Sequence, residues 1–170
     1  MKKIIVLTML VLSALGFAKE VNIKILGTSD VHGHIVPWNY QTDVFDDSGS
    51  YSQIAKMVAG YRKGNKNIIL VDAGDIIQDN LIERFINEPR HPAMLVLNQM
   101  GYDVMVPGNH EFNFGMPALD NVLKQFKGKV LAANIYYDNG ANYLPASTII
   151  TKEGVKIGII GVTTPLTEKF

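Results

Sequence analysis

The stretch Ile68-Ile69-Leu70-Val71-Asp72-Ala73-Gly74-Asp75 predicts a buried strand that ends in polar residues. Its first four residues form a short continuous apolar run, which is typical of strands in a sheet covered by helices. The run stops at Asp72, and a glycine then precedes the carboxylate of Asp75. The stretch therefore predicts an interior strand with reactive side chains at its carboxyl end.

The same pattern occurs before and after this stretch. A strand over 21–26 is followed by Asp30-Val31-His32, and a strand over 103–106 is followed by Gly108-Asn109-His110. Apolar periodicity and turn residues predict further elements: helices over 51–62, 80–87, 92–100 and 117–126, a strand over 130–133, a hairpin over 147–162, and a long loop over 33–50. Strands that alternate with helices predict an α/β fold.

Several local details follow from residue type. Ser50 is expected to cap the helix over 51–62, with Ile54, Val58 and Tyr61 on one face. Asp79 is expected to cap the helix that follows it. The alternative is that its carboxylate, close to the polar strand end at Asp75, tunes the binding of a substrate or a metal. Glycines at 27, 74 and 108 are expected to let the backbone bend sharply at each strand end.

The three polar strand ends are expected to meet, because the carboxyl ends of strands in α/β sheets lie on one rim. Two carboxylates, two imidazoles and one amide would gather there: Asp30, His32, Asp75, Asn109 and His110. This set suits divalent metals held by oxygen and imidazole. Asp75 is the natural bridge between two ions, and a two-metal site favours phosphate esters as substrates. His110 could then stabilise developing charge or protonate the leaving oxygen.

Composition narrows the function classes. The 170 residues contain 16 Lys and Arg, 16 Asp and Glu, and no Cys. The lack of Cys excludes disulfide scaffolds, zinc ribbons, iron–sulfur clusters and thiol nucleophiles. A balanced charge argues against binding to nucleic-acid polymers, which requires a basic surface.

The first 18 residues predict a secretory signal peptide. Two lysines precede an uncharged run over 4–18, and Gly16 and Ala18 suit a peptidase that cuts after Ala18. The run is short for a transmembrane helix, which needs roughly 20 apolar residues. We therefore expect a mature domain over 19–170 in the periplasm, at the cell surface or in the medium, with no stable membrane insertion after cleavage.

The motifs resemble those of the calcineurin-like metallophosphoesterases. Ser29-Asp30-Val31-His32-Gly33, Asp72-Ala73-Gly74-Asp75 and Gly108-Asn109-His110-Glu111 match the first three signatures of that family. The resemblance is closest to the secreted 5′-nucleotidase and 2′,3′-cyclic-nucleotide 2′-phosphodiesterase branch, and it covers residues 21–164. It implies a β-sheet sandwich flanked by helices, of which this chain holds the N-terminal portion.

The resemblance also implies roles for individual residues. Asp30, His32 and Asp75 would hold one divalent ion, Asp75 and Asn109 would hold the other, and His110 would be the catalytic histidine. The two ions could be Mn, Zn, Fe, Co or Mg. The 5′-nucleotidases carry an Asp that pairs with this histidine, whereas this chain has Asn113, as in the cyclic-nucleotide branch. The implied substrates are therefore 2′,3′-cyclic nucleotides, with 3′-nucleotides as a further class.

The family's later metal ligands lie beyond the stretch that this chain matches. A later Gly-His and a later His-x-His or His-x-Gln complete the two sites in the family, and this sequence has no histidine after His110. The family also carries a C-terminal domain that binds the nucleotide base. We therefore expect residues 19–170 to be the N-terminal part of a catalytic domain, with little activity by itself.

Three alternatives stay open from the sequence. The protein could be a 5′-nucleotidase of the same family, a protein Ser/Thr phosphatase, or a secreted non-catalytic remnant of the fold. The phosphatases fit less well because their second motif carries an Arg after Gly-Asp, where this chain has Ile76. Trp38, Tyr40, Phe112 and Phe114 are expected to pack in the core or at the rim of the site, His34 to be solvated, and His91 to lie in a turn. The oligomeric state is left open.

Overall fold

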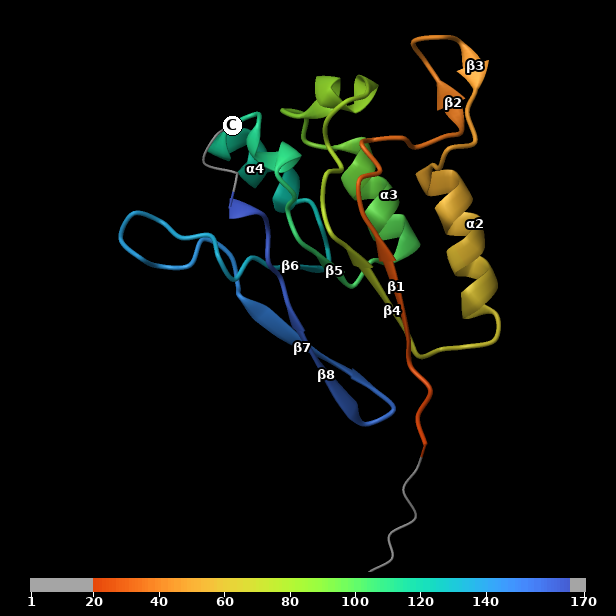
Figure 1. The fold of residues 1–170 in the computed structure, drawn as a ribbon, viewed down its shortest axis with the longest axis vertical. Helices are drawn as coiled ribbons and strands as arrows, with labels where there is room; N and C mark the ends of the chain where they lie inside the picture. The colour runs from red at the N-terminus through yellow and green to blue at the C-terminus, as the bar shows by residue number, and fades with distance from the viewer. Residues whose placement is uncertain (1–19, 166–170) are drawn as a thin grey trace, which may run out of the picture.

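The computed structural model describes residues 20–165, so the predicted signal peptide at 1–18 lies outside the described residues. A parallel sheet of four strands forms the centre of the molecule (Figure 1). The strand order in space is β1-β4-β5-β6, with bounds Lys24–Thr28, Ile68–Asp72, Val104–Met105 and Lys129–Val130. This arrangement confirms the predicted α/β fold, and it places the carboxyl ends of all four strands at one rim.

Helices follow the strands, mostly at the predicted positions. α2 (Tyr51–Arg62) and α3 (Pro92–Met100) have the predicted bounds, and Gly101 ends α3 with a left-handed φ of 69°. The segment predicted as a helix over 80–87 is a short 3₁₀ helix, η1 (Leu81–Phe85). The helix predicted over 117–126 is α4 (Met116–Leu123), because the residues after it make tighter hydrogen bonds three residues back.

The hydrophobic core lies between the sheet and the helices. Leu70 and Met105 from the sheet are fully buried against apolar side chains of all three α-helices and of η1. The face of α2 that carries Ile54, Val58 and Tyr61 is only partly buried. Tyr61 is 43% exposed, with Lys24 Nζ 4.3 Å above its ring, and the buried aromatic residue of α2 is Tyr51.

Ser50 occupies the N-cap position of α2 but makes no capping hydrogen bond. The carbonyls of His34 and Ile35 accept the N–H groups of Tyr51 and Ser52, so the preceding loop satisfies the first turn of the helix. The Ser50 hydroxyl donates instead to Gln53 Oε1 at 2.8 Å. A tertiary contact has replaced the local cap that the sequence predicted.

Two small hairpins complete the fold. β7 (Ser147–Lys152) and β8 (Val155–Ile160) form the predicted antiparallel hairpin, which lies across the sheet from α2 (Figure 1). The strand predicted over 130–133 ends at Val130, because the N–H groups of residues 132 and 133 bond to carbonyls that flank this hairpin.

The predicted loop over 33–50 contains a second, two-stranded hairpin, β2 (Trp38–Asn39) and β3 (Val44–Phe45). It rises above the start of α2 in Figure 1. Among residues 20–165, no helix has both the length and the apolar character that crossing a membrane requires.

Candidate functional site

The loops that follow β1 and β4 are joined by backbone hydrogen bonds. The Asp30 N–H donates to the Gly74 carbonyl at 3.0 Å, and the His32 N–H donates to the Asp75 carbonyl at 2.9 Å. The Ala73 N–H donates to the Thr28 carbonyl at 2.8 Å, which extends the ladder between the two strands. Main-chain hydrogen bonds therefore hold the polar ends of β1 and β4 side by side, as the sequence predicted.

The backbone of this rim adopts conformations that ordinary residues avoid. Asp30, His32 and Asp75 have φ angles of 54°, 47° and 58°, and Asp79 has 71°. Left-handed φ is uncommon outside glycine, and each such residue costs about 1–2 kcal/mol. Because backbone strain of this kind gathers at functional sites, its presence at three of the predicted site residues supports a function for the rim.

Two glycines at the rim are required by close approach. A Cβ atom on Gly74, which has φ of 98°, would lie 2.1 Å from the Gly108 nitrogen. A Cβ atom on Gly108 would lie 2.2 Å from Asp75 Oδ1. The expectation for Gly27 is wrong, because β1 runs straight through it and a Cβ atom there would meet only Val71 at an ordinary 3.7 Å.

Glu111 is a structural part of the site that the sequence reasoning missed. Its carboxylate is fully buried and accepts N–H groups from Asp75, Ile76 and Gly108 at 2.6–2.8 Å, and from Ile77 at 3.3 Å. It thereby ties the loop after β4 to the loop after β5. Burial raises the pKa of Glu111, and the backbone hydrogen bonds oppose that effect. The signal was its place directly after the Asn109-His110 pair.

The rim brings three potential metal ligands together. His32, Asp75 and His110 each offer one ligand atom, and these atoms lie within 4.8 Å of one another. The backbone N–H of His110 donates to Asp75 Oδ1 at 2.9 Å, so only one oxygen of that carboxylate is engaged by this bond. Two ligand atoms that each lie about 2.1 Å from a zinc-like ion are at most about 4.2 Å apart. A small inward movement of these three side chains would therefore let all of them reach one ion. Two imidazoles and a carboxylate fit a divalent transition-metal ion.

The other predicted ligands lie beside this group. Asp30 lines the same pocket as His32, but its carboxylate is outside the 4.8 Å cluster. Asn109 stands at the N-cap of η2 (His110–Phe112), next to His110, with a helical φ of −72°. The structure therefore gathers His32 and Asp75 with His110, and it places Asp30 and Asn109 on the flanks.

Two side-chain amides, those of Gln78 and Asn113, lie close to Nδ1 of the His110 imidazole. Gln78 Oε1 lies 2.7 Å from His110 Nδ1, and it also accepts a hydrogen bond from Asn113 Nδ2. Because that carbonyl oxygen can only accept, this contact favours the tautomer of His110 that carries the proton on Nδ1 and the lone pair on Nε2. Asn113 Nδ2 itself lies 3.2 Å from Nδ1. The sequence analysis did not predict the contact of Gln78 with this histidine, because the two residues are 32 positions apart.

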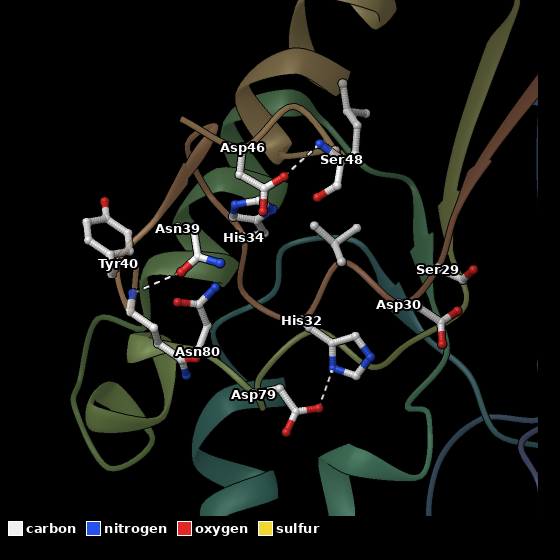
Figure 2. A pocket seen from close by; sticks show the side chains of 14 residues that line it. Ser29, Asp30, His32, His34, Asn39, Tyr40, Asp46, Ser48, Asp79 and Asn80 are labelled. Atoms are coloured by element: carbon white, nitrogen blue, oxygen red, sulfur yellow. Dashed lines mark hydrogen bonds and ion pairs between the residues drawn. The ribbon is translucent and has the colours of Figure 1, made fainter. Parts of the chain in front are cut away.

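A pocket opens from the cluster toward the loop over 33–50. Its lining includes Asp30, His32, His34, Tyr40 and Asp79 (Figure 2). His34 is half-buried at this wall, so the expectation of a solvated loop side chain is only partly met. Among the aromatic residues of the region, Phe112 and Phe114 pack against the core, whereas Tyr40 is 54% exposed and borders the pocket.

Asp72 is a second buried carboxylate beneath the rim. It accepts hydrogen bonds from Thr28 Oγ1 at 2.6 Å and from the Gly74 N–H at 2.8 Å. Burial raises its pKa to about 7, against the opposing effect of these two hydrogen bonds. Asp72 therefore supports the turn through Gly74 from below.

Comparison with known proteins relates most of this chain to one family. Residues 23–166 match the family described as calcineurin-like phosphoesterase. A 2′,3′-cyclic-nucleotide 2′-phosphodiesterase/3′-nucleotidase of Haemophilus influenzae is 30% identical over 93% of this chain and 27% of the relative. A snake venom 5′-nucleotidase of Gloydius brevicauda is 30% identical over 86% of this chain and 26% of the relative.

The likeness extends to the fold. The crystal structure of the calcineurin-like phosphoesterase YfkN from Bacillus subtilis matches with a TM-score of 0.77 and 28% identity, over 86% of this chain and 50% of the solved chain. The chain spans about a quarter of the length of the two curated relatives, and half of the solved chain.

Proposed function

The chain belongs to the calcineurin-like phosphoesterase family, and on that premise we propose that it hydrolyses phosphate esters of nucleotides. Members of this family are hydrolases that use divalent metal ions, and the cluster of His32, Asp75 and His110 is the observation that carries the proposal here. The cluster lies at the carboxyl rim of the sheet, where α/β proteins bind their ligands.

The proposed ligands are Asp30, His32 and Asp75 for one ion, and Asp75 and Asn109 for a second. Asp75 suits the bridging place because it extends from a strained turn between the two other loops, with one oxygen engaged by His110 N–H. A pair of divalent ions held by these residues would supply Lewis acidity and would lower the pKa of bound water. The two sites are completed by later residues of the family's catalytic domain.

His110 is proposed as the catalytic histidine that serves the leaving oxygen. Gln78 holds the proton on Nδ1, so Nε2 is the atom that can face substrate and carry a proton to it. Asn113 supports this arrangement by donating to the same Gln78 oxygen. Two neutral amides orient the ring but stabilise an imidazolium less than a carboxylate would.

The proposed substrates are 2′,3′-cyclic nucleotides, with 3′-nucleotides as a second class. The support is the amide of Asn113 and the relative from Haemophilus influenzae, whose name carries both activities. The venom relative supports a 5′-nucleotidase as the alternative. The proposed signal peptide and the venom relative both support a location outside the cytoplasm, at the cell surface or in the periplasm.

The experiment that tests this function combines binding with hydrolysis. Protein carrying residues 19–170 is titrated with Mn²⁺, and its hydrolysis of 2′,3′-cyclic AMP, 3′-AMP and 5′-AMP is followed by phosphate release and chromatography. We expect Mn²⁺ binding that Asp75→Asn weakens, and slow hydrolysis at best, because the family's remaining ligands come from later in the domain. The protein extended through the whole domain should hydrolyse the cyclic nucleotide fastest.

Two results would contradict the proposal. Absence of metal binding and of hydrolysis in the extended protein would favour the non-catalytic remnant. A preference for 5′-AMP would replace the cyclic-nucleotide assignment by that of a 5′-nucleotidase.

A further inference from the structure

Asp79 does not play the structural part that its place in the sequence predicts. The N-cap of η1 is Asn80, whose Oδ1 accepts the Leu81 N–H at 2.9 Å. The carboxylate of Asp79 turns the other way, and its Oδ2 lies 3.2 Å from His32 Nδ1 (Figure 2). The prediction that Asp79 caps the helix is therefore wrong, and its side chain contacts a proposed metal ligand from another loop.

The backbone of Asp79 is held in place for this contact. Its N–H donates to Glu83 Oε1 at 2.7 Å, which ties it to η1. Its φ of 71° is a conformation that glycine adopts without strain and an aspartate does not. Glycine at this position would avoid the backbone strain, so the aspartate retains its carboxylate at a cost in backbone free energy.

His32 needs an acceptor on the side that Asp79 occupies. Apart from this ion-pair contact, Nδ1 is buried and makes no well-aligned hydrogen bond. Figure 2 shows the other ring nitrogen, Nε2, directed to the side of Asp30. The Asp79 side chain is 54% exposed, so a small rotation of its carboxylate can align it with an Nδ1 proton.

We propose that Asp79 is a positioning residue that keeps the proton of His32 on Nδ1 and aims Nε2 at a divalent transition-metal ion. The inference rests on the proposed function, because it concerns the metal site of that same rim. A carboxylate can only accept from the ring, so it favours the Nδ1–H tautomer and makes Nε2 the better electron donor. Asp79 itself lies outside the cluster of candidate ligands, which suits a residue that acts through His32.

Metal affinity gives the first test. Co²⁺ is titrated calorimetrically into the wild-type protein and into Asp79→Ala, Asp79→Asn and Asp43→Asn. Loss of such an outer partner weakens metal binding by roughly 10- to 100-fold, which we expect for Asp79→Ala. Asp79→Asn keeps an acceptor oxygen for Nδ1–H and should retain most of the affinity. Asp43 is a matched control, because it is an exposed acid with φ of 54° that does not line the pocket, and its variant should bind as wild type.

The tautomer of His32 gives the second test, in metal-free protein. Long-range ¹H–¹⁵N correlation spectra report which nitrogen carries the proton, and the His32 signals are identified by their loss in His32→Asn. We expect Nδ1–H in wild type and in Asp79→Asn, and a shift toward Nε2–H in Asp79→Ala. Thermal unfolding verifies that each variant folds, as expected for an exposed position.

Failure of this inference is separable from failure of the proposed function. If wild type binds no Co²⁺, the metal site is refuted while the tautomer experiment still tests the contact. If Asp79→Ala leaves both the affinity and the tautomer unchanged, Asp79 does not position His32. If Asp79→Asn binds as weakly as Asp79→Ala, the charge of Asp79 acts directly, and the orienting role is overturned.

Discussion

Within residues 20–165, the rim and the helical layer each bury an ionisable side chain completely, but only the rim supplies hydrogen-bond partners for it. At the rim, the carboxylate of Glu111 accepts four backbone N–H groups from two loops. In the helical layer, His91 precedes α3, and neither of its ring nitrogens has a hydrogen-bond partner among the described residues. Only its backbone N–H is engaged, by Gln125 Oε1. The prediction that His91 lies in a turn missed this complete burial.

The difference in hydrogen bonding between Glu111 and His91 shows how each region compensates, or fails to compensate, for the free-energy cost of burying an ionisable group. Burial raises the pKa of Glu111 and lowers the pKa of His91 to about 4, so in both cases the low dielectric disfavours the charged form. At the rim, the cost of burial is offset by hydrogen bonds that fix the loops bearing Asp75 and His110. In the helical layer, no described contact offsets it, so His91 should be a net destabilising residue.

Glu111→Gln should cause the largest loss of stability among the variants of these buried polar residues, because it removes the acceptor that distinguishes the rim from the helical layer. The amide NH₂ of Gln would face backbone donors, and each buried donor left unpaired costs about 1–3 kcal/mol, for a total of about 5 kcal/mol. Urea unfolding in the presence of a chelator measures the loss. Glu83→Gln is the control, since Glu83 accepts a single exposed hydrogen bond from Asp79. Equal losses in the two variants would contradict a special role for the rim carboxylate.

Asp72→Asn should remove a pH dependence of stability. The pKa of Asp72 rises from 3.8 to about 7 on folding, so the folded state binds more protons than the unfolded state between these values. The stabilisation is complete below about pH 4 and is lost as pH rises through 7, by about 4 kcal/mol. The free energy of unfolding, measured from pH 4 to 8 without metal, should fall less steeply in the variant. An unchanged slope would refute the shifted pKa.

His91→Leu should stabilise the protein, by about 2 kcal/mol at pH 7, because it removes two unpaired buried nitrogens at similar volume. The folded pKa of about 4 lies below the ordinary 6.5, so stability is lost as pH falls through this window. The variant should lose that acid sensitivity. Thermal unfolding at pH 7 and pH 5 tests both effects, with His34→Leu as a control on the partly exposed pocket wall. A destabilised His91→Leu would show that an unseen partner satisfies the ring.

Ser50→Ala should have the smallest effect of the four buried polar sites. The hydroxyl makes no cap, and the loop carbonyls that satisfy α2 remain in place, so we expect a loss below about 1 kcal/mol. Asn80→Ala, which removes a true capping bond of η1, should cost about 1 kcal/mol. A larger loss for Ser50 than for Asn80 in urea unfolding would restore Ser50 as the cap.

Much of the fold was readable from local pattern. The helices 51–62 and 92–100 have the predicted bounds, because their apolar spacing and their stop signals lie within the segments themselves. The meeting of Asp30, His32, Asp75 and His110 at one rim followed from the rule that the carboxyl ends of parallel strands lie on the same side of the sheet. The errors at Ser50 and Asp79 both involve the loop after β1, which no local pattern reveals. Carbonyls of residues 34 and 35 accept the first N–H groups of α2, and His32 contacts the Asp79 carboxylate.

The sequence by itself determined which chemical groups reach the rim, because strand periodicity and polar strand ends are properties of consecutive residues. Only the tertiary structure decided how those groups are held. The left-handed turns at Asp30, His32 and Asp75 lie in loops that bond to one another through the main chain. Three of the four hydrogen bonds to Glu111, and the contact of Gln78 with His110, join residues 32 to 36 positions apart in the sequence. Such contacts exist only once the loops have packed, so no local propensity encodes them.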